Sequence, residues 1–152
     1  MSSVIIQGDS TGSVTLQAPA AAGSTVINLP NVSMNMGNGG GNVSTNTAFG
    51  ASALAANSTG ANSTAVGYQA GVNATGTTNT HIGAYAGYGV TSGTNNTAIG
   101  YGSVGYFASG YVTGSYNTAV GDSALGKNTS GFNNSAVGYQ ALYSNTTGDT
   151  SV

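Results

Sequence analysis

The stretch NTAVGDSALGKNTSGFNNSAVGYQALYSNTTG, from Asn117 to Gly148, contains one short pattern twice. Asn117-Thr118-Ala119-Val120-Gly121 returns seventeen residues later as Asn134-Ser135-Ala136-Val137-Gly138. Each copy is followed by an Ala-Leu pair and by a polar stretch that ends in glycine. A fixed period of this kind is typical of a repeat architecture, in which each copy is one structural unit.

Four more copies of the pattern precede these two. They align on a branched or aromatic residue that stands immediately before a glycine, and we call this residue the anchor. The anchors are Phe49, Val66, Ile82, Ile99, Val120 and Val137. Their spacings are 17, 16, 17, 21 and 17 residues. A Thr or Ser stands two positions before each anchor, and an Ala or Ser stands four positions after it.

The length of the unit predicts the fold class. About 17 residues are too few for a strand, a helix and two loops, but they suit two short strands joined by tight turns. We therefore predict an all-β, parallel β-solenoid of 16–17-residue repeats. The first strand is Thr-Ala-Val-like, and a weaker second strand lies around the Ala-Leu pair. Alternation along the first strand separates the Thr and anchor side chains from the small Ala and Gly residues.

We expect the six anchors to form the core of the roll, with the flat Ala and Gly face outside. The threonines would then form a ladder of hydroxyl groups in the interior. The four extra residues between Ile99 and Val120 are expected to bulge outward at a turn.

The chain is expected to have three parts. Residues 1–30 are predicted to form a small N-terminal β module with strands at Val4–Gln7, Ser13–Gln17 and Thr25–Leu29. Residues 31–45 are a Gly- and Asn-rich linker, and residues 46–152 hold the repeats. Because Asp149–Val152 fits the start of a seventh unit, we expect the repeats to continue beyond the C-terminus.

The composition excludes several classes of function. Only 3% of the residues are charged, and the net charge is −2. A nucleic-acid-binding protein needs clustered Lys and Arg, so we expect no nucleic-acid partner. No apolar run is long enough to span a bilayer, so we expect no membrane insertion. The absence of cysteine rules out disulfides and thiolate metal sites within the chain.

The residues offer little for catalysis. There is no Glu, and Asp9, Asp122 and Asp149 are far apart in the sequence, so a pair of catalytic carboxylates is not expected. His81 occupies the small Ala position beside an anchor, and we expect it at the surface of the roll or at an interface. We predict no enzymatic activity, no catalytic residue, no metal site and no cofactor.

One aromatic stretch is a candidate contact for a receptor or another partner. The longest unit holds Tyr106, Phe107, Tyr111 and Tyr116 in or near the expected bulge. Aromatic rings in a protruding loop can stack on sugars or contact a protein. The alternative is that these rings pack against a neighbouring coil or subunit.

The narrow, Ala-rich coils also predict self-association. A single thin roll buries little apolar surface relative to the backbone entropy lost on folding. Association of identical chains relieves this deficit, and the near-absence of charge permits close packing. We expect a homotrimer.

The repeats resemble those in the head of YadA-type trimeric adhesins, through motifs such as Asn95-Asn96-Thr97-Ala98-Ile99-Gly100. The resemblance covers about Asn46 to Val152 and implies a left-handed parallel β-roll built from three chains. In that family the position two before the anchor is usually aliphatic, whereas here it is Thr or Ser. The family's binding residues match no position of this sequence.

The N-terminal segment resembles parts of bacteriophage fibre and tail-associated proteins, through Gly12–Pro19 and Thr25–Pro30. Together the two resemblances imply a structural phage fibre, of the tail or of the head, located in the virion. Residues 1–30 would bind other virion proteins, and the roll would project a region that contacts a host glycan or protein. The alternatives are a bacterial trimeric adhesin at the cell surface and an ice-binding β-solenoid.

Overall fold

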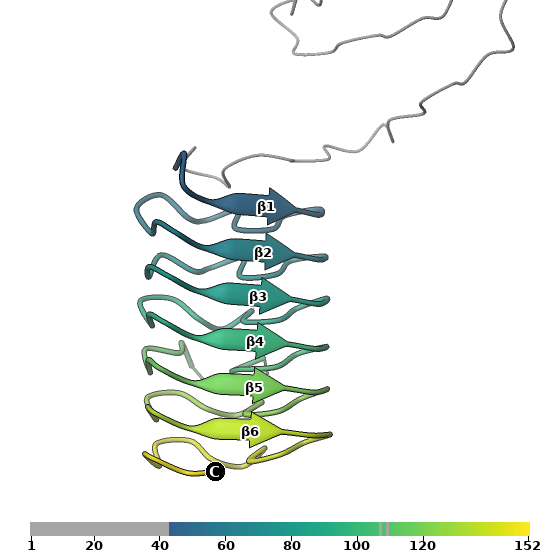
Figure 1. The fold of residues 1–152 in the computed structure, drawn as a ribbon, viewed down its shortest axis with the longest axis vertical. Helices are drawn as coiled ribbons and strands as arrows, with labels where there is room; N and C mark the ends of the chain where they lie inside the picture. Colours follow the sequence, from purple (N-terminus) through teal and green to yellow (C-terminus); the bar gives the residue numbers. More distant parts are fainter. Residues whose placement is uncertain (1–42, 107, 109) are drawn as a thin grey trace, which may run out of the picture. The chain divides into compact units, whose positions relative to one another are not determined.

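The computed structural model describes residues 43–106, 108 and 110–152. The predicted N-terminal module and the first twelve residues of the linker lie outside the described residues. The described part forms a β-solenoid with one strand per unit, and the six strands form one parallel sheet in chain order (Figure 1). The strands are β1 (Thr47–Phe49), β2 (Thr64–Val66), β3 (Thr80–Ile82), β4 (Thr97–Ile99), β5 (Thr118–Val120) and β6 (Ser135–Val137).

The register of the sheet confirms the alignment of the repeats. Each anchor pairs with the anchor of the next unit, as Ile99 does with Val120 across β4 and β5. The threonines pair in the same way, from Thr47 with Thr64 to Thr118 with Ser135. Even the 21-residue unit keeps this register, so the extra residues are accommodated entirely outside the sheet.

The side chains of the strands point the opposite way from the prediction for the core. The alanine at the centre of each strand points inward, and Ala65, Ala98 and Ala119 are fully buried. The anchors point outward, since Phe49 is 43% exposed and Val137 is 75% exposed. The prediction that the anchors fill the core is therefore wrong. All six face outward and are half-buried or exposed: Phe49, Val66, Ile82, Ile99, Val120 and Val137. The predicted interior hydroxyl ladder is likewise an outer column of threonines.

The wall opposite the sheet explains this reversal. It brings its own bulky side chains inward, including Leu54, Val104 and Leu125, all fully buried. A coil of about 17 residues is narrow, so a leucine on one wall leaves room for only an alanine on the other. The larger Thr and anchor side chains are therefore placed outside.

This opposite wall contains turns rather than the predicted second strand. Two positions in it repeatedly have a left-handed backbone, at Ser52 and Leu54 in the first unit and at Ser123 and Leu125 in the fifth. A β-strand does not contain such residues. Successive coils are still hydrogen-bonded to one another along this wall. The backbone N–H of Leu54, for example, donates to the carbonyl of Ala70 in the next coil at 3.0 Å.

A column of buried asparagines links the coils along one corner. The amide nitrogen of Asn96 donates to the Gly114 carbonyl at 2.9 Å, and its Oδ1 accepts from the backbone N–H of Asn117 at 3.0 Å. The second unit has Ser63 at this position, whose hydroxyl accepts from the N–H of Asn79. The asparagines of this column are Asn46, Asn79, Asn96, Asn117 and Asn134. Each asparagine closes its own turn and ties it to the next coil.

The glycine that closes each unit forms a second column at the same corner. A Cβ atom at Gly76 would lie 2.1 Å from the carbonyl oxygen of Gly93, and one at Gly114 would lie 2.1 Å from that of Gly131. Because both contacts involve backbone atoms, no side-chain movement can relieve them. The closing glycines therefore set how closely successive coils approach.

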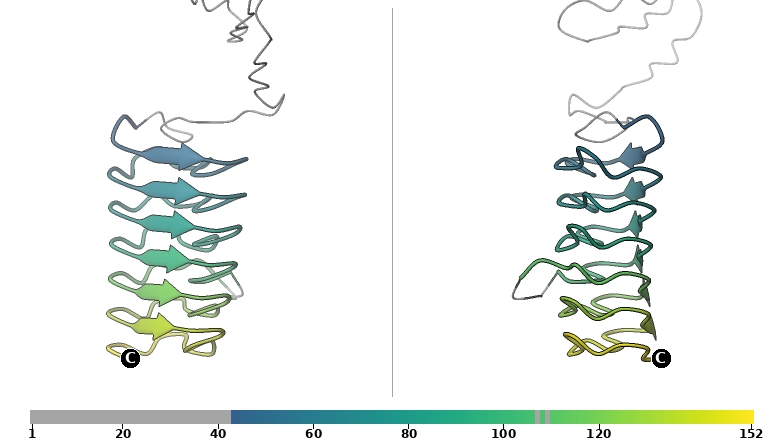
Figure 2. Two further views of the ribbon diagram at one scale, coloured as in Figure 1. Left: turned by 45° about the vertical axis from the view of Figure 1, so that its right-hand side comes forward. Right: turned by 90° about the vertical axis from the view of Figure 1, so that its left-hand side faces the viewer.

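The long unit leaves the stack between β4 and β5, as predicted, and returns in register (Figure 2). Val112 then rejoins the stack through an isolated parallel bridge to Val90.

Candidate functional site

The outer face of the six-stranded sheet is a regular surface that runs along the whole described stack. It carries a column of Thr or Ser beside the column of anchors, and both run across all six strands. No charged residue occurs in any of the six strands. An exposed row of aliphatic and aromatic side chains of this kind is typical of a surface that packs against another protein chain. We call this surface the outer sheet face.

A group of five tyrosines forms the second notable surface, just beyond the ends of β2, β3 and β4. Tyr85 lies at its centre, with ring centroids 5.3 Å from Tyr68 and 5.7 Å from both Tyr88 and Tyr101. Tyr106, from the long unit, contacts Tyr85 at 4.8 Å. We call this group the tyrosine cluster. Edge-on contacts at such distances are favourable and fix the orientation of each ring.

The hydroxyl groups of the cluster also interact with one another. Partial burial and the neighbouring phenols, Tyr68 and Tyr106 among them, raise the pKa of Tyr85 above its ordinary value. A hydrogen bond with Tyr101 raises the pKa of Tyr106 in the same direction. Both effects favour the neutral form of the Tyr85 and Tyr106 phenols.

The four aromatic residues predicted as a partner contact do not form one group. Tyr106 packs into the tyrosine cluster, which is the packing alternative that the sequence left open. Tyr111 and Tyr116 are 73% and 61% exposed. Phe107 lies outside the described residues. The recurrence of Tyr68 and Tyr101 two residues after their anchors is visible in the sequence, but their contact with Tyr85, Tyr88 and Tyr106 is not.

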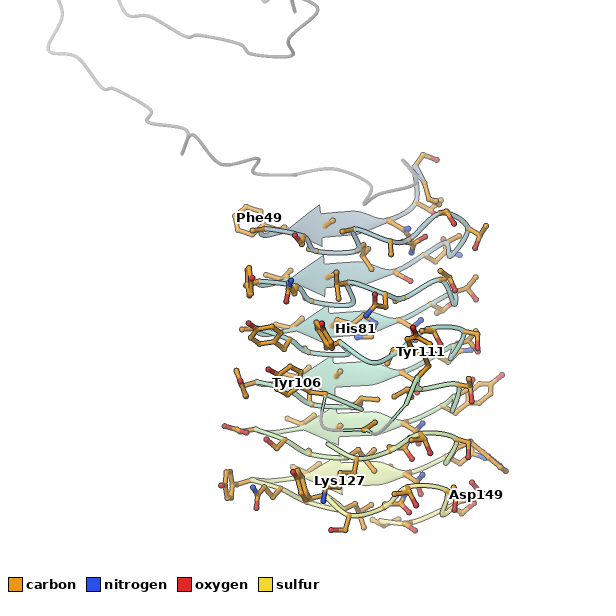
Figure 3. All side chains as sticks on the ribbon, turned by 180° about the vertical axis from the view of Figure 1, so that it is seen from behind. Phe49, His81, Tyr106, Tyr111, Lys127 and Asp149 are labelled. Carbon is orange, nitrogen blue, oxygen red and sulfur yellow. The ribbon has the colours of Figure 1, made fainter. Side chains whose placement is uncertain are left out.

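His81 lies inside the stack rather than on its surface, which corrects the prediction (Figure 3). It replaces the central alanine of β3 and is fully buried. A Cβ atom at Gly87 would lie 1.9 Å from its Nδ1, and one at Gly71 would lie 2.6 Å from its Cδ2. Both glycines stand five residues after an anchor, where each of the other four units has Leu or Val. The imidazole therefore fills the space that two such side chains would occupy.

The environment of His81 is unusual for a polar group. Within the described part of the chain, neither ring nitrogen has a hydrogen-bond partner. Burial lowers the pKa of His81 from 6.5 to about 4. The side chain is therefore neutral at physiological pH, and it cannot act as a base for a hydroxyl group that it does not contact.

The charged residues of the described part are dispersed. Asp122 and Lys127 belong to the fifth unit, where Lys127 Nζ lies 5.1 Å from the centroid of the Tyr143 ring. Asp149 accepts a hydrogen bond at 3.0 Å from the backbone N–H of Phe132. No group of three metal-binding side chains occurs among the residues with a described position. The described part of the chain also contains no helix that is long and apolar enough to cross a membrane.

The chain matches no protein-family model, no curated protein and no solved structure.

Proposed function

We propose that this chain is a structural, non-enzymatic part of a bacteriophage fibre, and that three copies associate through the outer sheet face. The observation that carries this proposal is the column of half-buried and exposed anchors on an uncharged parallel sheet. A surface helix or sheet of a monomer normally has polar residues on its outer side. Here the apolar residue recurs at the same outward position in all six units.

The stacking of the coils supports a role as a spacer. Six strands at a separation of about 4.8 Å form a segment roughly 25 Å long, and added units lengthen it without changing its cross-section. The asparagine and glycine contacts between coils recur along the stack, with Ser63 in place of the asparagine in the second unit. The similarity of the repeats to YadA-type heads and of the N-terminal segment to phage fibres supports the same proposal. Residues 1–30 then attach the fibre to the other virion proteins.

Of the alternatives, a bacterial surface adhesin would use the same roll and the same association. An ice-binding solenoid calls for a regular Thr-X-Thr array on a flat outer face. Each strand here presents one Thr or Ser outward, followed two residues later by an apolar anchor. This pattern favours packing against protein over ordering of water.

Light scattering of the full chain tests the association. We expect three times the mass of one chain. The variant Ile99→Lys places a charge in the centre of the outer sheet face, and we expect it to be monomeric because an unpaired charge is costly at a buried interface. The control Ala55→Lys adds the same charge at an exposed position on the opposite wall and should remain trimeric. A monomeric wild type, or equal behaviour of the two variants, would contradict the proposed interface.

Labelling of intact particles with antibodies against the chain tests the location. We expect labelled fibres that project from phage particles. Label found only on bacterial surfaces would favour the adhesin.

A further inference from the structure

The tyrosine cluster stands apart from the outer sheet face and from the contacts that hold the coils together. It is made of Tyr68, Tyr85, Tyr88, Tyr101 and Tyr106, which come from three successive units, the last of which is the long unit. The first unit has none of these rings, because Ala51 and Ser52 stand at the corresponding positions. The sixth unit has two tyrosines at the corresponding positions, Tyr139, which is 74% exposed, and Tyr143. A regular spacer does not require such a local concentration of aromatic rings.

The surface of the cluster is open to a ligand. Tyr68 is 49% exposed and Tyr101 is 43% exposed, although both contact Tyr85. They occupy the same register position two units apart, so their backbones are separated by about 10 Å along the stack. The cluster therefore forms an elongated platform, held in fixed orientation by ring contacts. Little side-chain entropy remains to be lost when a ligand binds.

The charge of the surroundings limits the kind of partner. From Val43 to Tyr116 the sequence contains no Asp, Glu, Lys or Arg, and its only histidine is the buried His81. Single-stranded nucleic acids also stack on aromatic platforms, but their binding requires a positively charged groove beside the rings. The next coil adds one acid, Asp122, at the register position of Tyr101, and one base, Lys127, whose Nζ lies 5.1 Å from the centroid of the Tyr143 ring. One lysine beside one carboxylate does not make a positively charged groove, so an acidic glycan gains no net attraction here.

The packing of the rings excludes a second class of ligand. Quaternary ammonium groups bind inside aromatic cages, where the cation lies within about 6 Å of several ring centroids. In the cluster, the rings fill this space themselves, since Tyr85 is 4.8–5.7 Å from each of its four neighbours. The available surface is the outside of the platform and not a cavity between rings.

We propose that the tyrosine cluster binds a neutral, linear glycan along the axis of the stack. A sugar ring has an apolar face of C–H groups, which suits the exposed phenol rings, and hydroxyl groups at its rim, which suit the phenol hydroxyls. The length of the platform suits a ligand of more than one sugar unit. This proposal rests on the proposed fibre function, in which the glycan belongs to the host surface.

Saturation-transfer NMR on the full chain, with uncharged tetra- to hexasaccharides of hexoses as the probe, tests the proposal. We expect transfer from the tyrosine ring protons to the sugar C–H protons. The double variant Tyr68→Ala/Tyr101→Ala removes the two exposed rings and should weaken binding about tenfold or more, because both stacking surfaces are lost. Tyr139→Ala, at the same register position in the sixth unit, is the matched control and should bind like the wild type.

Three outcomes of the binding measurements would overturn the proposal. They are no transfer to any neutral sugar of the panel, equal loss in Tyr139→Ala, and equal or stronger binding of acidic oligosaccharides. Light scattering of the double variant separates this proposal from the fibre function. If the variant dissociates into monomers, the cluster is an interface between copies of the chain and not a glycan site. If the chain stays trimeric and particle-bound but binds no sugar, only the glycan proposal fails.

Discussion

Replacement of Gly76 by alanine is expected to lower the free energy of unfolding by about 3 kcal/mol, or to abolish cooperative unfolding. The added Cβ would lie 2.1 Å from the carbonyl oxygen of Gly93 and 2.8 Å from that of Ser92. Because the obstructing atoms belong to the backbone of the next coil, the two coils must move apart. Overpacking by one carbon typically costs about 1–3 kcal/mol, and a rigid neighbour places this site at the upper end.

The expected loss of stability at Gly76 comes from the contact with the next coil and not from local backbone strain. The φ of Gly76 lies outside the left-handed region, so alanine fits locally and by itself would favour folding slightly. Gly110→Ala is the matched control, since no atom lies within 4 Å of the position of its Cβ. Urea unfolding followed by circular dichroism measures both variants. Equal stability of the two would contradict the close approach of successive coils.

Acidification from pH 7 to pH 4 is expected to destabilise the fold by about 3 kcal/mol through His81 alone. The pKa of His81 is about 4 in the fold and 6.5 in the unfolded chain, so the unfolded chain binds more protons in this range. The free energy of unfolding therefore rises with pH over the range in which the unfolded chain binds more protons than the folded chain. The full contribution is present above about pH 6.5 and is lost as the pH falls towards 4.

The composition isolates this effect. The chain has no Glu and its only His is His81, and histidine is the side chain whose ordinary pKa puts its charge change between pH 5 and 8. The slope of stability between pH 5 and pH 6.5 therefore reports His81. In the variant His81→Phe, an uncharged ring of similar size fills the same space, and the slope should disappear. A slope that persists in this variant would contradict the assignment. His81→Ala should be less stable than His81→Phe at every pH, because alanine beside Gly71 and Gly87 leaves a cavity.

The register of the solenoid was predictable because the period alone determines it. The recurrence of Thr, Ala and anchor at fixed positions specifies which residues pair, and the pairing of Ile99 with Val120 across the long unit follows from it. Which face of the sheet lies inside was not predictable from the alternation of residues. Alternation places Thr97 and Ile99 on the same face but does not say whether that face is the inner or the outer one. The width of the coil decides this, and it depends on Leu54 and its equivalents across the interior.

The buried position of His81 did have a signal in the sequence. Five residues after each anchor, most units have Leu or Val, whereas the unit of His81 and the preceding unit have Gly87 and Gly71. A large residue at the alanine position, compensated by two glycines, indicates that the three side chains share one space. The tyrosine cluster had only a partial signal: Tyr68 and Tyr101 recur two residues after their anchors, but Tyr106 reaches the cluster only through the path of the long unit.

Formation of an engineered disulfide tests the stacked register most directly. Cysteines at Thr97 and Thr118, which pair across β4 and β5, would have Cα atoms about 5 Å apart, within the range that a disulfide spans. The chain has no other cysteine. We predict a complete intrachain crosslink in Thr97→Cys/Thr118→Cys, seen by mass under denaturing conditions, and none in Thr80→Cys/Thr118→Cys, whose positions are two strands apart. Efficient crosslinking of the second pair, or none of the first, would contradict the solenoid.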